Sequence, residues 1–112
     1  MQVQFKYIEE FKKCAKVLRK RYKSFDEDYD KLLNALEKDP MQGVSLGGGV
    51  RKIRMAVASK RQGKSGGVRV LTYNAKLINP ELVIITFLSV YDKSDIDNVK
   101  DAYIKGLLAE LQ

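Results

Sequence analysis

The sequence predicts an α+β fold: an N-terminal helical hairpin packed on a small antiparallel sheet of three or four strands, followed by a C-terminal helix. Three observations lead to this prediction. Apolar residues recur at three- and four-residue steps between about Ile8 and Pro40, which is typical of helices. From Val50 to Tyr91 the pattern alternates with a period of two, as in strands. Helical spacing returns in the last part of the chain. We expect one domain, residues 1–112, because this length is near the commonest domain size.

The first helix is expected from about Ile8 to Lys23, after a short strand in which Val3 and Phe5 alternate with polar residues. Its apolar positions fall on one face, and lysines occupy the other. The apolar face comprises Phe11, Cys14, Ala15, Leu18 and Tyr22. Cys14 is therefore interpreted as a small core residue.

A second helix is expected to start at Ser24. Ser24 and Glu27 have the spacing of a capping box, in which each side chain binds the other residue's backbone amide. The apolar positions of this helix are Phe25, Tyr29, Leu32, Leu33 and Leu36. Pro40 ends it, because proline cannot donate the helical hydrogen bond. Almost no residues separate the two helices, so we expect an antiparallel hairpin.

Three strands are expected after a glycine-containing loop at Gly43–Gly49. They start at Val50, Val68 and Leu82, and a basic loop, Ser59–Gly67, separates the first two. The third strand is apolar on both faces, so it should be central and covered on both sides.

The C-terminal helix is expected to be capped at Ser94–Asp97. Its buried stripe comprises Ile96, Val99, Tyr103, Leu107 and Leu111. We expect the helices to cover one face of the sheet. The other face would then carry Lys52, Arg54 and Arg69.

The composition excludes several classes of chemistry. The chain contains no histidine, which excludes Ser-His-Asp and Cys-His nucleophile systems. With only one cysteine as well, it has no ligand set for structural zinc. The single Cys14 fits a reducing compartment. The first residues contain no apolar signal segment. The longest apolar run, Leu82–Val90, is too short to span a bilayer. We therefore expect a cytoplasmic protein with no membrane partner.

The formal charge of +7 is distributed in blocks. Residues 51–69 contain seven basic and no acidic residues. A small basic domain of this kind indicates a polyanionic partner, usually nucleic acid. On this basis the residues expected to contact RNA phosphates are Arg51, Lys60, Arg61 and Lys64.

Two further motifs are interpreted without a ligand. Ala58–Ser65 has the spacing of a relaxed phosphate-binding loop, but such a loop needs a helix to begin at its lysine, and here two glycines and a strand follow. Asp95, Asp97 and Asp101 lie in the first turns of the expected helix, where the helix dipole favours acids. We therefore expect neither a metal ion nor a cofactor.

The strongest local feature is a group of cations on one sheet face. Lys52 and Arg54 occupy alternate strand positions, so they project from the same face about 7 Å apart. Arg69 on a neighbouring strand can complete a cluster of three, and arginine offers planar donors that match phosphate. Tyr91 closes the apolar strand, with its ring either near this basic face or in the core.

The chain resembles the RelE/ParE toxin superfamily of bacterial toxin–antitoxin systems. The matching stretches are Gly49–Lys60, Gly63–Val70 and Phe87–Ser94, and the helices before and after them also fit. They look most like its RelE/HigB-type branch. The resemblance covers nearly the whole chain. It implies a RelE-like fold and a cytoplasmic toxin that inhibits translation as a ribosome-dependent mRNA endonuclease (an mRNA interferase).

The resemblance also implies roles for individual residues. In this family the ribose 2′-OH attacks the adjacent phosphorus without a metal, assisted by basic residues and a tyrosine. Lys52 matches as the candidate base, since a lysine crowded by cations releases its proton more readily. Arg54 and Arg69 match as groups that stabilise phosphate charge. Tyr91 or Lys93 matches as an acid or a base-stacking group.

The resemblance further implies a cognate antitoxin in a higher-order complex, and charge complementarity suggests that an acidic antitoxin segment covers the basic face. Two alternative functions remain open. The first is a ParE-like toxin that inhibits DNA gyrase without cutting RNA. The second is a decayed or non-toxic relative that binds RNA through its charge alone.

Overall fold

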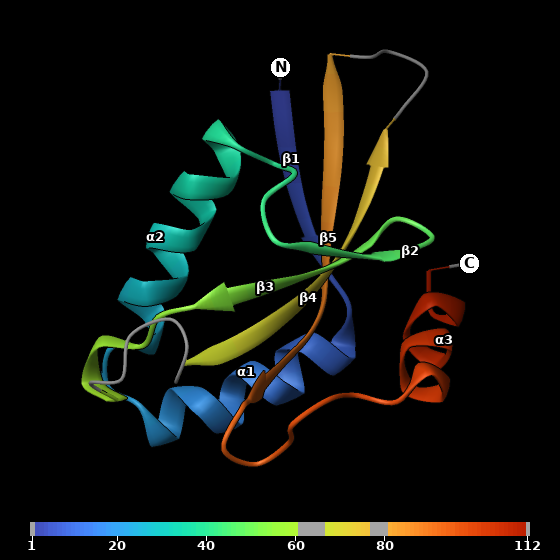
Figure 1. Cartoon of the computed structure of the whole chain (residues 1–112). Helices are drawn as coiled ribbons and strands as arrows, with labels where there is room; N and C mark the ends of the chain where they lie inside the picture. The colour runs from blue at the N-terminus through green and yellow to red at the C-terminus, as the bar shows by residue number, and fades with distance from the viewer. Residues whose placement is uncertain (1, 61–66, 77–80, 112) are drawn as a thin grey trace.

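The computed structural model describes residues 2–60, 67–76 and 81–111, and within them three α-helices and a five-stranded sheet (Figure 1). The elements in chain order are β1 (Gln2–Tyr7), α1 (Glu9–Arg21), α2 (Phe25–Lys38), β2 (Val44–Gly47), β3 (Val50–Met55), the short 3-10 helix η1 (Ala58–Lys60), β4 (Val68–Lys76), β5 (Leu82–Asp92) and α3 (Asp101–Ala109). The predicted α+β class is confirmed.

The sheet differs from the prediction in size and in direction. Its strand order is β1-β5-β4-β3-β2, and β1 runs parallel to β5 while the other pairs are antiparallel. The expected antiparallel sheet of three or four strands is therefore wrong. Strand β2 lies in the segment predicted as a loop, and Gly47–Gly49, all with positive φ, fold it back onto β3. The parallel pairing of β1 joins residues about eighty positions apart, which local spacing does not reveal.

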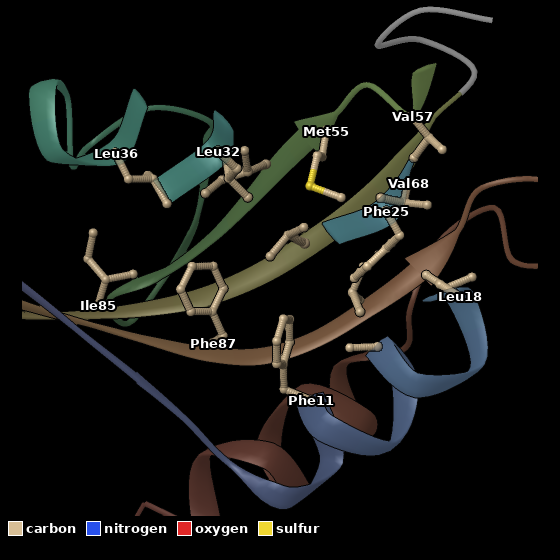
Figure 2. Close-up of a cluster of buried hydrophobic side chains, with 14 of the residues drawn as sticks. Phe11, Leu18, Phe25, Leu32, Leu36, Met55, Val57, Val68, Ile85 and Phe87 are labelled. Atoms are coloured by element: carbon tan, nitrogen blue, oxygen red, sulfur yellow. The ribbon is translucent and has the colours of Figure 1, made fainter. Parts of the chain in front are cut away.

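Helices α1 and α2 cover one face of the sheet. Figure 2 shows their apolar side chains, including Phe11, Leu18, Phe25 and Leu36, directed at strand residues such as Phe87. The two helices diverge from their short connection in Figure 1, so the expected antiparallel hairpin does not describe their arrangement. Both still contribute to one core.

Helix α3 lies on the opposite face, which corrects the prediction that all helices share one face. Leu107 of α3 packs in a second cluster with Leu71 and Leu88 of the sheet. Strand β5 is consequently covered on both sides, as its apolar sequence predicted. None of the helices in the described residues is long and apolar enough to cross a membrane.

Two predicted helix caps are wrong. Ser24 makes no capping hydrogen bond, and its Oγ instead donates to Asp28 Oδ2 at 2.7 Å. Helix α3 begins at Asp101 rather than near Ser94, because Ser94 donates both its backbone N–H (3.0 Å) and its Oγ–H (2.6 Å) to Asp92 Oδ1. These bonds hold the start of the predicted helix in a turn.

Candidate functional site

The sheet register brings three of the predicted residues into one row. Arg54 of β3 lies directly opposite Arg69 of β4, and Arg69 lies directly opposite Tyr91 of β5. Directly opposed residues have Cβ atoms about 4.5–5.5 Å apart. Lys52 lies two positions from Arg54 on the same strand and face. The strands thus assemble a cluster that the sequence only suggested.

These cations border a surface hollow of about 560 Å³, which we call the basic hollow. Among the described residues, its charged lining consists of four cations and one acid: Lys52, Arg54, Arg69, Lys93 and Asp97. Its other lining residues are Gln42, Gly43, Val44, Ile53 and Asn98. Four of the five residues predicted as catalytic therefore face a common space, and that space is cationic.

Three of the four cations in the basic hollow are not neutralised by a described acid. Lys52, Arg54 and Lys93 form no ion pair with another described residue. Arg69 is only 4% exposed, and its Nη1 donates to the backbone carbonyls of Gly67 and Val68 at 3.4 Å. Burial, reinforced by the facing charge of Arg54, lowers the pKa of Arg69. A bound anion would relieve both effects.

Tyr91 of β5 lies directly opposite Arg69 of β4. Its residue is 6% exposed, and its buried hydroxyl has no hydrogen-bond partner among the described residues. Burial raises the pKa of Tyr91, and the neighbouring Arg69 opposes this rise. The hydroxyl therefore stays protonated at neutral pH and keeps its proton to donate. The side chain packs with the α3 cluster and does not line the basic hollow, so both placements considered from the sequence apply in part.

The wall of the basic hollow depends on a glycine before β2. Gly43 has φ +95°, and a Cβ at this position would lie 2.6 Å from the carbonyl oxygen of Lys52. Only glycine combines this backbone conformation with so close an approach. Arg51 fixes the same segment from the other side of the strand, because it donates to the carbonyls of Gln42 (3.2 Å) and Gly43 (2.9 Å).

Two of the four residues predicted to contact RNA, Arg51 and Lys60, do not line the basic hollow. Arg51 is engaged in the backbone contacts just described. Lys60 has a side chain only 9% exposed and forms an ion pair with Asp92 at 2.6 Å. Arg61 and Lys64 lie outside the described residues.

Asp92 is the centre of a separate, neutralised cluster on the α1 side of the sheet. Its fully buried carboxylate accepts hydrogen bonds from Lys60, Arg21 (3.1 Å), Tyr22 and Ser94. Burial alone would raise the pKa of Asp92, but the bonds from Lys60, Ser94 and Tyr22 outweigh it and hold the pKa well below its usual range. The cluster ties the end of β5 to α1 and η1.

Several lining residues were missed from the sequence. Asp97 was assigned to a helix cap, Gly43 and Val44 were assigned to a loop, and Gln42 and Asn98 were given no role. The glycine at position 43 was the available signal, since a glycine next to a strand often marks a close backbone approach. In residues 2–60, 67–76 and 81–111 no three Cys, Asp or Glu side chains are grouped so as to hold a metal ion.

Comparison of the sequence with protein families and with curated proteins gives no match.

Proposed function

We infer that the protein is an RNA endonuclease that acts without a metal on translated mRNA, as a toxin of the RelE/HigB type within a RelE-like fold. The observation that carries this inference is the basic hollow, where Lys52, Arg54, Arg69 and Lys93 surround one space. Guanidinium groups bind phosphate through paired donors and stabilise charge that develops on it.

The proposed reaction is an internal transesterification. The ribose 2′-oxygen forms a bond to the adjacent phosphorus, and the bond from phosphorus to the 5′-oxygen breaks, which leaves a 2′,3′-cyclic phosphate. The proton of the 2′-OH passes to a base, for which Lys52 is the candidate. The leaving 5′-oxygen gains a proton from an acid, for which the exposed Lys93 is better placed than the buried Tyr91 hydroxyl.

Arg54 and Arg69 then stabilise the extra negative charge of the pentacoordinate phosphorus. Tyr91 lies directly opposite Arg69 on the neighbouring strand, and its role in the proposal is to position the Arg69 side chain. A cognate antitoxin with an acidic segment would neutralise this chemistry by covering the basic hollow. Copurification of this chain with the product of a neighbouring gene would test that partner.

The test is a cell-free translation reaction with purified protein, in which mRNA 5′ ends are mapped with and without ribosomes. Cuts confined to ribosome-bound message support the proposal. Cuts on free RNA would show that the protein is a nuclease whose mechanism does not require the ribosome. Equal cutting by a Lys52→Ala, Arg69→Ala double variant would assign the activity elsewhere.

A second candidate is an RNA-binding protein without catalysis, which the buried Tyr91 hydroxyl favours because the site then lacks a tyrosine acid at its surface. Intact message with salt-sensitive RNA binding would support it. Intact message together with inhibition of purified gyrase would instead support a gyrase-directed toxin.

A further inference from the structure

The basic hollow is the middle one of three adjoining depressions. A depression of about 340 Å³ beside α2 shares Gln42 and Arg54 with it. A depression of about 350 Å³ beside α3 shares Lys52 and Asn98 with it. We call these the α2-side hollow and the α3-side hollow. The shared residues place the three spaces in sequence along β3.

Each outer hollow has the same chemical character. The α2-side hollow combines Lys31 with the apolar side chains of Leu32 and Met55. The α3-side hollow combines Lys105 with those of Leu46 and Ile104. Both lysines are exposed, and neither forms an ion pair with another described residue.

This combination suits unpaired nucleotides. Single-stranded nucleic acid presents phosphates and base faces together, so its sites combine cations with side chains against which bases pack, most often aromatic ones; in the two outer hollows the described packing side chains are aliphatic. A duplex hides its base faces and offers mainly phosphates. A lysine beside an apolar wall, repeated on both sides of a cationic centre, therefore matches a single strand better than a duplex.

We propose that the three hollows form one track for single-stranded RNA, with Lys31 and Lys105 binding phosphates on either side of the central phosphate. The inference rests on the proposed function for the identity of the strand as RNA. It adds two binding residues, from α2 and α3, that act on the flanks of the substrate. Neither takes part in the bond-breaking step.

The acids on the track predict which flank binds more strongly. Asp28 borders the α2-side hollow, but it is buried and its Oδ2 accepts hydrogen bonds from Ser24 Oγ (2.7 Å) and the N–H of Ala58 (3.1 Å). Asp101 borders the α3-side hollow and is exposed. Lys31 should therefore contribute more to affinity than Lys105.

The experiment measures fluorescence anisotropy of 2′-O-methyl RNA, which cannot be cut because it lacks the attacking hydroxyl. A trinucleotide and a nonanucleotide are titrated with the wild type and with Lys31→Ala, Lys105→Ala and Arg54→Ala. Lys38→Ala is the matched control, since it removes an exposed lysine of α2 that borders none of the three hollows. Alanine favours helix, so the helical variants retain the fold.

We expect Lys31→Ala and Lys105→Ala to weaken the affinity for the nonanucleotide severalfold and to leave the affinity for the trinucleotide unchanged. Each should also reduce the slope of log affinity against log salt by about 0.7, the value for one single-strand phosphate contact. Arg54→Ala should weaken the binding of both oligonucleotides, and Lys38→Ala should weaken the binding of neither. An RNA duplex of equal length should compete poorly.

Two results would overturn the track and separate it from the proposed function. In the first, Arg54→Ala weakens the binding of both oligonucleotides while Lys31→Ala and Lys105→Ala behave like the control. The basic hollow would then bind RNA and the two outer hollows would not. If Arg54→Ala also matches the control, or the wild type binds neither oligonucleotide at low salt, the basic hollow is not an RNA site and both inferences fail.

Discussion

Tyr91 and Asp92 are consecutive residues of β5, and they face two clusters of opposite character. Asp92 is surrounded by donors, and Lys60 and Arg21 are paired with its buried carboxylate. Tyr91 faces the side where Arg54 and Arg69 oppose each other and a single acid borders the basic hollow. The first cluster satisfies its charges within the fold, and the second leaves cationic charge at the surface.

This difference separates cations that stabilise the fold from cations that we propose to serve function. A cation paired with a buried acid contributes to folding, and removing one member of the pair is costly. Like charges placed opposite each other on a sheet destabilise it. A fold retains such an arrangement when it serves a function, because local rules are broken mainly at functional sites. Lys60 belongs to the first class and Arg54 to the second, although both lie in the same basic block of the sequence.

The largest expected effect is on stability, at the neutralised cluster. Asp92→Ala should lower the free energy of unfolding by about 3–5 kcal/mol, because it leaves several buried donors without their acceptor. Urea denaturation followed by circular dichroism measures it. Asp95→Ala removes only the exposed partner of Arg21 and serves as the control. A loss below about 1 kcal/mol for Asp92→Ala would contradict the structural role.

Arg54→Ala should produce the opposite result, a loss of activity without a loss of stability. We expect RNA cleavage to slow by about 10²–10³-fold, as when one group that stabilises a charged transition state is removed. Arg54 is exposed and makes no ion pair with described residues, so the melting temperature should stay within a few degrees. Single-turnover cleavage rates and thermal melts of the same preparation test this. A destabilised but fully active variant would reverse the comparison.

Acid should affect the Asp92 cluster. Because folding lowers the pKa of Asp92, its stabilising contribution is complete above the unfolded pKa of about 3.9 and is lost as the pH falls toward the folded pKa. We expect the free energy of unfolding to fall by about 2 kcal/mol between pH 5 and pH 2 from this residue alone. Asp92→Asn should flatten that part of the profile. An unchanged profile would show that other carboxylates control acid unfolding.

The smallest effect is expected for an exposed pair. Arg19 donates to Asp26 at 2.7 Å, but both side chains are more than half exposed. Arg19→Ala should therefore change the free energy of unfolding by less than about 1 kcal/mol and leave cleavage unchanged. The same assays apply. A cleavage defect would show that cations outside all three hollows also serve the reaction.

Much of the fold could be predicted because its signals are local. The apolar spacing of α1 and α2 and the alternation along β3 and β4 follow from short-range periodicity. Strand β2 was missed because it has only four residues, all exposed, inside a segment bounded by Gly43 and Gly49. The start of α3 was misplaced because Asp92, outside the expected cap, takes the hydrogen bonds of Ser94.

The sequence by itself determined that Lys52 and Arg54 share a face of one strand, because side chains alternate along a strand. Only the tertiary structure decided the partners of that face. The register set Arg69 between Arg54 and Tyr91, and the packing of Asp92 withdrew Lys60 from the surface. The fold also placed Lys31 and Lys105 in the outer two of the three adjoining hollows. These outcomes depend on contacts between distant residues, and the spacing of residues along one strand or helix does not specify them.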